Sequence, residues 1–338
     1  MSFRKYTKAL MRLRFLIVCE IILLVACKFP SRYGAIVQYQ KGMTIPSWNE
    51  TEYLNDSLSI SISTLKDLGS DYIAITPTWH QLTKESNQIY STSITPSDSA
   101  VKRIILLAKS MGYQIMLKPH LDVEDGSFRG NIQPSNFTIW FQAYTNFIIH
   151  YAKIGQELNV DVFCIGTELK KISARPEWQT IIDTTRKIYT RRLTYAANWD
   201  EYTNVCFWGY LDYVGIDAYF PLAENREATI EEYLENFQLW LNQIDNYQSR
   251  IEKDVIITEI GFRSIKGSGY QPYDWQSLGI MDENSQASAY ETILETLQRK
   301  TWLAGIYFWK WDPILKDDSL GYSPYHKKAS DVIKRFWQ

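Results

Sequence analysis

The segments Val162-Phe163-Cys164-Ile165-Gly166-Thr167-Glu168 and Val255-Ile256-Ile257-Thr258-Glu259-Ile260-Gly261-Phe262 decide the fold of this chain. Each contains a short apolar run rich in β-branched residues, which is typical of a buried strand. Each run leads into a glutamate, Glu168 or Glu259. Because a carboxylate is costly to remove from water without a partner or a purpose, we expect this pair to serve a site. The alternative is that each is a surface residue just past its strand, or half of a structural ion pair.

Six further segments show a similar strand-like pattern, which brings the count to eight. In chain order the expected strands span residues 41–45, 72–76, 114–118, 162–166, 192–196, 213–217, 255–258 and 305–309. Apolar residues at three- and four-residue spacing predict helices between them, at 100–110, 137–157, 176–189, 230–247 and 285–300. This alternation predicts one α/β domain, a single (β/α)8 TIM barrel over residues 38–338. A doubly wound open sheet is the alternative, although no glycine-rich phosphate loop follows the first strand.

The alternation of side chains within the expected strands also indicates a barrel. Successive side chains of a barrel strand point alternately to the lumen and to the helices. In the third strand Lys118, His120 and Asp122 share one face. The same alternation directs a second set inward, comprising Gly166, Glu168, Gly215, Asp217, Tyr219, Ile257 and Glu259. Polar lumen residues at the carboxyl ends of strands are where barrel enzymes carry out their chemistry.

The composition excludes some functions and favours others. The chain has 338 residues, is 45% hydrophobic and has a formal net charge of −2, with basic and acidic residues mixed throughout. It is therefore long enough to bury one large core, and nothing favours nucleic acid as a partner. Twelve Trp and 23 Tyr provide flat, hydrogen-bonding surfaces of the kind that line sugar-binding sites. The alternative for any one ring is packing between helices and sheet.

The N-terminus has the pattern of an export signal. Basic residues precede an apolar stretch from Phe15 to Ala26 that is short for a membrane span, and Glu20 within it departs from a good signal. The stretch ends in Leu24-Val25-Ala26-Cys27, which resembles the bacterial lipobox. We expect residues 1–27 to form a lipoprotein-type signal peptide, Cys27 to be lipidated and residues 28–37 to form a tether. The protein would then be a cell-envelope lipoprotein, held on the extracytoplasmic side of a bacterial membrane.

The cysteines do not indicate a metal or disulfide framework. Cleavage before Cys27 would remove Cys19 and leave Cys164 and Cys206 as the only other thiols, without metal-ligand spacing. We expect no metal and no organic cofactor. A bridge between Cys164 and Cys206 is left open.

Two carboxylates on different strands are the groups that a retaining glycosidase needs. One acts as the proton donor and the other as the nucleophile, about 5–5.5 Å apart. The two must differ in protonation at the working pH.

Six segments together resemble a known family. They are KGMT at 41–44, KPHLD at 118–122, IGTEL at 165–169, YAANW at 195–199, GIDAYFPL at 215–222 and TEIG at 258–261. Over residues 38–312 the chain is similar to glycoside hydrolase family 113, within the clan of retaining (β/α)8-barrel hydrolases. The resemblance implies hydrolysis of β-1,4-mannan or mannooligosaccharides, with Glu168 as acid/base and Glu259 as nucleophile. Many clan members have Asn directly before the acid/base, and this Asn contacts the 2-hydroxyl of the sugar. Here Thr167 occupies that position, and Asn198 is a candidate to make the contact instead.

Candidate substrate-binding residues lie at the ends of the expected strands. Tyr219 is placed to orient Glu259, and Asp217 is expected to pair with Lys118. Trp309 is the expected floor for the sugar whose bond is cleaved. The remaining candidates, each with a structural alternative, are His120, Asp122, Trp48, Trp79, His80 and Trp199.

The expected partners are a polysaccharide or oligosaccharide and, through the lipid anchor, a membrane. Two alternatives remain for the function: hydrolysis of another β-glycan such as glucan or xylan, and a non-catalytic carbohydrate-binding surface lipoprotein.

Overall fold

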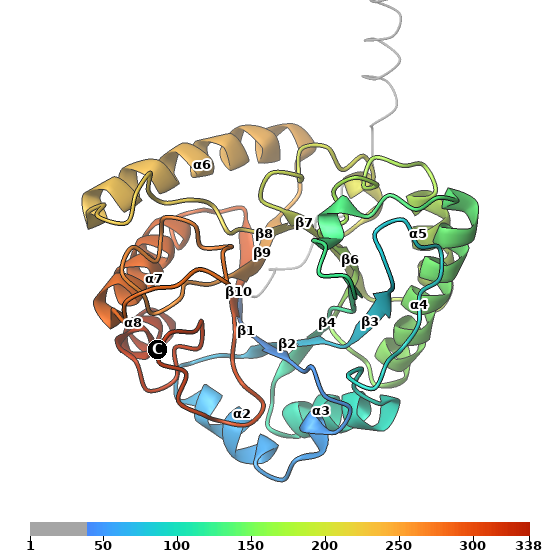
Figure 1. The fold of residues 1–338 in the computed structure, drawn as a ribbon, viewed down its shortest axis with the longest axis horizontal. Helices are drawn as coiled ribbons and strands as arrows, with labels where there is room; N and C mark the ends of the chain where they lie inside the picture. The colour runs from blue at the N-terminus through green and yellow to red at the C-terminus, as the bar shows by residue number, and fades with distance from the viewer. Residues whose placement is uncertain (1–38) are drawn as a thin grey trace, which may run out of the picture. The chain divides into compact units, whose positions relative to one another are not determined.

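The computed structural model describes residues 39–338, which form a closed barrel of eight parallel strands (Figure 1). Around the barrel the strands follow the order β1-β10-β9-β8-β7-β6-β4-β2. Their bounds are β1 Gln40–Pro46, β2 Tyr72–Thr76, β4 Gln114–Leu117, β6 Val162–Thr167, β7 Arg192–Asn198, β8 Val214–Asp217, β9 Val255–Ile260 and β10 Leu303–Trp309. The predicted (β/α)8 barrel is confirmed, and each expected strand agrees with an observed one to within two residues at either end.

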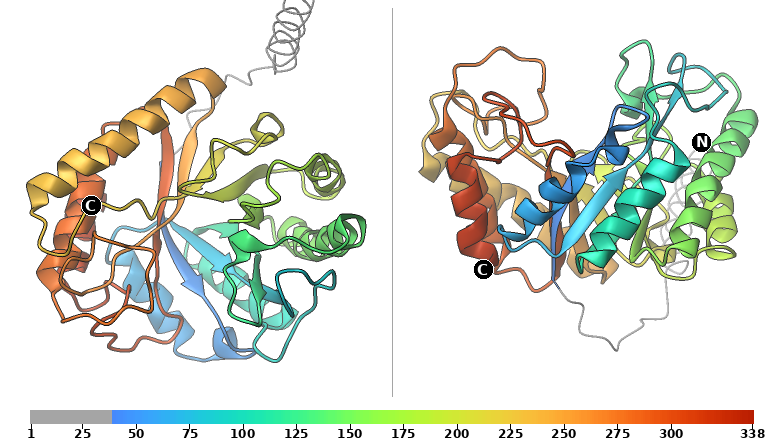
Figure 2. Two further views of the ribbon diagram at one scale, coloured as in Figure 1. Left: turned by 45° about the horizontal axis from the view of Figure 1, so that its top comes forward. Right: turned by 90° about the horizontal axis from the view of Figure 1, so that it is seen from below.

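Helices surround the barrel on its outer side (Figures 1 and 2). Their bounds are α2 Leu58–Lys66, α3 Asp98–Ser110, α4 Phe137–Glu157, α5 Trp178–Arg186, α6 Ile230–Ile251, α7 Glu283–Leu297 and α8 Lys328–Trp337. The longest, α6, begins with a capping box in which the side chains of Thr229 and Glu232 each accept a backbone N–H from the other residue. The sequence patterns predicted α3 to α7 and missed α2 and α8. No helix of the described residues is long and apolar enough to cross a membrane.

A second, two-stranded sheet extends the barrel beyond β2 and β4. It pairs β3 (Thr78–Gln81) with β5 (His120–Val123), in parallel. Pro77 and Pro119 interrupt the two strands of the barrel just before these extensions. Lys118 at the end of β4 and His120 at the start of β5 therefore both remain at the carboxyl end of the barrel.

Two β-bulges interrupt the strict inward and outward alternation of side chains that the sequence predicted. The register between β6 and β7 shifts between Cys164 and Thr167, and a Cβ on Gly166 would lie 2.8 Å from Tyr144 Oη, outside the lumen. The register between β8 and β9 shifts in the same way, so that Ile257 pairs with Ile216 in the apolar core against the helices. The inward orientation expected for Gly166 and Ile257 is therefore wrong, because each bulge inserts an extra residue.

Many aromatic residues of the described part of the chain are buried. The side chains of Trp140, Trp178, Trp208 and Trp311 are fully buried. For these rings the packing alternative considered from the composition is confirmed. The predicted signal peptide, the lipidation of Cys27 and the tether at 28–37 lie outside the described residues.

Candidate active site

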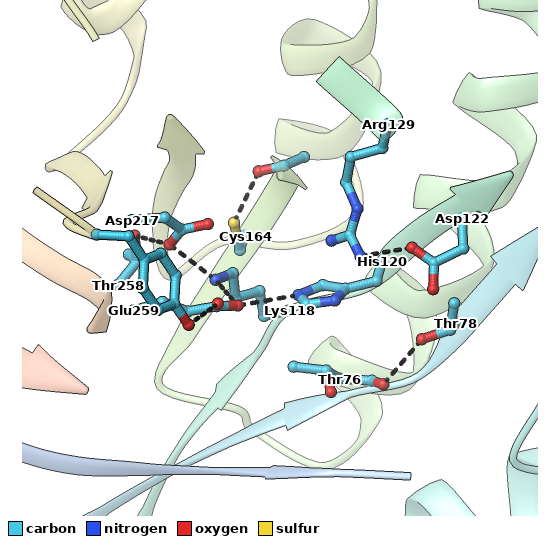
Figure 3. Close-up of polar contacts among 12 residues, drawn as sticks. Thr76, Thr78, Lys118, His120, Asp122, Arg129, Cys164, Asp217, Thr258 and Glu259 are labelled. Carbon is cyan, nitrogen blue, oxygen red and sulfur yellow. Dashed lines mark hydrogen bonds and ion pairs between the residues drawn. The ribbon is translucent and has the colours of Figure 1, made fainter. Parts of the chain in front are cut away.

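A buried ammonium group joins two of the predicted carboxylates at the carboxyl end of the barrel (Figure 3). Lys118 Nζ lies 2.6 Å from Glu259 Oε1 and 3.0 Å from Asp217 Oδ1. Thr258 adds a hydrogen bond of 2.7 Å to Asp217 Oδ1. Burial alone would lower the pKa of Lys118, but the two carboxylates hold it above its ordinary value. The predicted pairing of Lys118 with Asp217 is confirmed.

Glu259 receives a second hydrogen bond on its other oxygen. The Tyr219 hydroxyl, just past β8, donates to Glu259 Oε2 at 2.9 Å, as the sequence predicted. Burial and the nearby negative charge of Glu259 raise the pKa of Tyr219 well above its usual range, so the hydroxyl keeps its proton. With Lys118 on one oxygen and Tyr219 on the other, the Glu259 carboxylate is fixed in orientation.

Glu168 follows β6 and differs from Glu259 in its surroundings. It is half-buried, while Glu259 is 5% exposed. Burial first and then the negative charge of Asp217 raise the pKa of Glu168 well above its usual range, with a further contribution from Glu259. Arg129 and Lys118 oppose this shift. Glu168 therefore holds its proton to higher pH than an ordinary glutamate does.

Arg129 is a site residue that sequence reasoning missed. It lies in a 3-10 turn, η2 (Arg129–Asn131), and forms an ion pair with Asp122. Its guanidinium also interacts electrostatically with Glu168 and Glu259. Only a weak signal for this residue was present in the sequence. Arg129 lies seven positions after Asp122 in a segment whose conformation no sequence period predicts.

His120 lies beside Glu259 and stacks on one of two neighbouring tryptophans. The His120 and Trp309 rings are nearly parallel, with centroids 6.2 Å apart, and Trp48 meets Trp309 edge-on at 6.1 Å. His120 Nε2 lies 3.5 Å from Glu259 Oε1, too far for a good hydrogen bond, and has no hydrogen-bond partner. Burial and the charges of Arg129 and Lys118 lower the pKa of His120 well below its usual range, so the ring is neutral.

Asn198 ends β7 directly beside Asp217, with which it is in register. Its side-chain Oδ1 is buried and has no hydrogen-bond partner. Its backbone N–H donates to Glu201 Oε2 at 2.9 Å. His80 lies on β3 opposite Asp122 of β5, and its Nδ1 lies 3.2 Å from Thr92 Oγ1.

The structure does not bring Trp79 and Trp199 into this group. Trp79 packs against Phe147 and Tyr151 of α4 and donates its indole N–H to the Tyr151 hydroxyl at 3.0 Å. Trp199 stacks on Tyr273, with centroids 6.2 Å apart, and contacts Trp240 of α6. Trp79 is thus packed on α4, and Trp199, just past β7, is packed on Tyr273 and α6.

The thiols and acidic groups of residues 39–338 form no metal-binding cluster. Cys164 is buried, Cys206 is exposed, and neither forms a disulfide bond.

The site as a whole provides one oriented carboxylate, Glu259, and one carboxyl group with a raised pKa, Glu168. Polar and aromatic groups accompany them.

Comparisons with known proteins agree with this fold. The chain is 25% identical to a solved family 113 β-1,4-mannanase, with a TM-score of 0.83, over 89% of this chain and 99% of that one. The β-mannanase AaManA of Alicyclobacillus acidocaldarius is 23% identical, with a TM-score of 0.81, over 89% of this chain and 97% of that one. A β-glucuronidase of Ruminococcus gnavus, 12% identical with a TM-score of 0.61 over 89% of this chain and 49% of that one, shares the fold. No curated protein matched.

The family comparison covers most of the described barrel. The model of Glycoside Hydrolase Family 113 matches residues 46–324, which include every candidate site residue discussed above. The chain therefore belongs to glycoside hydrolase family 113 and is a glycoside hydrolase.

Proposed function

We propose that the protein hydrolyses β-1,4-mannan or mannooligosaccharides with retention of configuration, by a double displacement at Glu259 and Glu168. The observation that carries the proposal is the contrast between the two glutamates. Glu259 is held by two donors, Lys118 and Tyr219, whereas the pKa of Glu168 is raised. A nucleophile and a proton donor need this difference.

In the first displacement Glu259 attacks the anomeric carbon and Glu168 gives its proton to the departing glycosidic oxygen. The products are a glycosyl-enzyme ester and the released part of the chain. Bonding to Glu259 neutralises its charge, which removes one of the causes that raise the pKa of Glu168. The deprotonated Glu168 is then a base of suitable strength for the second step.

In the second displacement Glu168 takes a proton from water as the water oxygen attacks the anomeric carbon. The ester bond to Glu259 breaks and its carboxylate returns to Lys118 and Tyr219. The sugar leaves with its original configuration because the carbon has been inverted twice.

The groups beside the glutamates are suited to hold a pyranose ring. Trp309 offers an indole face for the axial C–H groups of the sugar. The unpartnered atoms His120 Nε2 and Asn198 Oδ1 are positioned to bind sugar hydroxyls, because a buried polar atom without a partner gains most from a ligand. Asn198 would thereby supply the contact that clan members make with the residue replaced here by Thr167.

Mannan is the proposed substrate because the solved family 113 structures similar to this chain are β-1,4-mannanases. A panel of mannan, glucan, xylan and their oligosaccharides, assayed with residues 28–338, tests this choice. Faster hydrolysis of glucan or xylan would show that this glycan, and not mannan, is the substrate. The proposed mechanism would be unaffected. Binding without hydrolysis of any member would favour a non-catalytic carbohydrate-binding protein.

The mechanism is tested by Glu259→Ala assayed with azide. We expect the variant to hydrolyse no substrate at more than about a hundredth of the wild-type rate, a loss of at least roughly 3 kcal/mol in transition-state stabilisation. Azide should restore turnover of a dinitrophenyl β-mannoside and give the α-mannosyl azide, with inversion. Glu168→Gln is the matched control, since azide would then intercept the glycosyl-enzyme and give the β-mannosyl azide. The same anomer from both variants would refute the assigned roles.

We also propose that Cys27 carries a lipid anchor that holds the barrel outside the cytoplasm, with residues 28–37 as the tether. The order of basic segment, short apolar run and Leu24-Val25-Ala26-Cys27 supports this proposal. An anchored enzyme would act where glycan fragments reach the cell envelope.

A further inference from the structure

Glu201 is a buried carboxylate that the proposed reaction does not use. Its residue is 0% exposed, and it follows β7 by three positions. The Tyr195 hydroxyl donates to Glu201 Oε1 at 2.6 Å, and the backbone N–H of Asn198 donates to Oε2 at 2.9 Å. Burial raises the pKa of Glu201 to about 7, and the hydrogen bonds from Tyr195 and Asn198 oppose this shift and offset part of the cost of burial.

Tyr195 connects this carboxylate to the segment that carries Glu168. Its hydroxyl accepts the backbone N–H of Leu169 at 2.8 Å while it donates to Glu201. The Tyr195 ring packs edge-on against the stacked rings of Trp178 and Phe207, with centroid distances of 5.3 Å to each. A Cβ on Gly166 would come within 2.8 Å of this ring, so only glycine at that position leaves room for it.

The backbone of Glu168 has an uncommon conformation. Its φ is 54°, in the left-handed region that residues other than glycine seldom adopt. The N–H of Glu168 donates to the carbonyl of Ala196 at 2.8 Å, and the next N–H, of Leu169, donates to Tyr195. Both peptide groups that flank the Cα of Glu168 are thus bonded to residues of β7, which fixes φ and ψ at Glu168 and the direction of its side chain.

We propose that Glu201 is a positioning residue that acts through Tyr195 to hold Glu168 in its left-handed conformation and aim its carboxyl group at the glycosidic oxygen. Through the N–H of Asn198 it also fixes the residue whose unpartnered Oδ1 is proposed above to bind the sugar. This inference rests on the proposed roles of Glu168 and Asn198. It adds to them a series of hydrogen bonds that runs from Glu201 through Tyr195 to the backbone beside Glu168.

The test uses Tyr195→Phe, which keeps the packed ring and removes the hydroxyl, and Glu201→Gln, which keeps the size and leaves one acceptor atom for two donors. Both should lower kcat on mannooligosaccharides by about 10- to 100-fold, since a misplaced group loses about that much rate. Glycosylation by a dinitrophenyl mannoside, whose leaving group needs no proton, should change less than about threefold. Tyr307→Phe is the matched control, because Tyr307 is a buried tyrosine whose hydroxyl bonds Gln40 at the opposite end of the barrel.

If Glu201 and Tyr195 are merely structural, both variants should lose activity on mannooligosaccharides and on the dinitrophenyl mannoside equally, in proportion to the loss of folded protein. That result would overturn the inference. Crystal structures supply a readout that does not depend on activity. In Tyr195→Phe the φ of Glu168 should leave the left-handed region, and an unchanged φ would refute the positioning role. If the wild-type enzyme hydrolyses neither mannoside, the proposed function fails, while the backbone of Glu168 in the variant still decides this inference.

Discussion

Lys118 Nζ lies 2.6 Å from Glu259 Oε1, and the Lys118 side chain is fully enclosed in the barrel. The same ammonium group lies 3.0 Å from Asp217, so two buried carboxylates share one positive charge. Buried like charges this close cannot both remain ionised without a counterion. Lys118 therefore supplies the positive charge that contacts the proposed nucleophile.

Lys118→Met tests this relationship. Removing the ammonium group leaves two buried carboxylates unpaired, so we expect the free energy of unfolding to fall by about 3–5 kcal/mol. Chemical denaturation measures this change. Lys300→Met is the control, because Lys300 follows α7 in a loop and its pair with Asp245 of α6 is partly exposed, so its loss should cost about 1 kcal/mol or less. Equal stability of Lys118→Met and the wild type would contradict the assigned role of Lys118 as the counterion of these carboxylates.

The raised pKa of Glu168 predicts the alkaline limb of the pH profile. Glu168 must be protonated to donate, so hydrolysis of mannooligosaccharides should persist below the raised pKa and fall as the pH rises through it. Glu168→Gln should lose about 100-fold or more on oligosaccharides and much less on a dinitrophenyl mannoside, for which the alkaline limb should vanish. Glu177→Gln, at a surface pair with Arg175, should keep the limb. An alkaline limb that persists in Glu168→Gln would exclude Glu168 as the acid.

The fold and the centre of the site were predictable because their signals repeat with a fixed period. The alternation of Lys118, His120 and Asp122 correctly indicated a polar lumen, and the pairing of Lys118 with Asp217 followed from it. Gly166 and Ile257 were placed wrongly because the two β-bulges add a residue that a strict period of two does not contain.

Other parts of the site carry no periodic signal. Arg129 comes from a loop turn, and only the folded chain brings its guanidinium to Asp122. The direction of Trp79 could have been predicted, since neighbouring residues of a strand point to opposite faces. Trp79 of β3 therefore points away from the side of its neighbour His80, toward α4, whereas Trp199 lies past the end of β7 and carries no such signal.

Cys27→Ala tests the proposed membrane anchor. When the full chain is expressed in a bacterial host, the wild type should be recovered in the membrane fraction, because the several acyl chains of a lipoprotein give stable attachment. Cys27→Ala should lack the lipid, as mass spectrometry of the N-terminal peptide would show, and keep the wild-type kcat and KM. Wild-type protein free in the medium, or with an intact N-terminus in the cytoplasm, would refute the anchor.

Trp79→Ala separates packing from substrate binding. The Trp79 ring packs against Phe147 and bonds the Tyr151 hydroxyl, so its removal should lower the free energy of unfolding by about 2–4 kcal/mol. KM for mannooligosaccharides should stay at the wild-type value in the folded protein. A rise in KM with unchanged stability would restore the sugar-platform role that the sequence suggested.

Trp309→Ala should show the opposite pattern. The ring is half-buried, and it lies beside His120 and Trp48 at the proposed sugar site. A stacking floor contributes both to binding and to the distortion of the sugar near the transition state, so KM should rise and kcat should fall together. We expect kcat/KM to drop by about 100-fold or more, a loss of roughly 3 kcal/mol in transition-state stabilisation. The unfolding midpoint should change less than in Trp79→Ala. If Trp309→Ala instead unfolds, and the activity lost matches the folded protein lost, Trp309 is a core residue and the sugar floor must lie elsewhere.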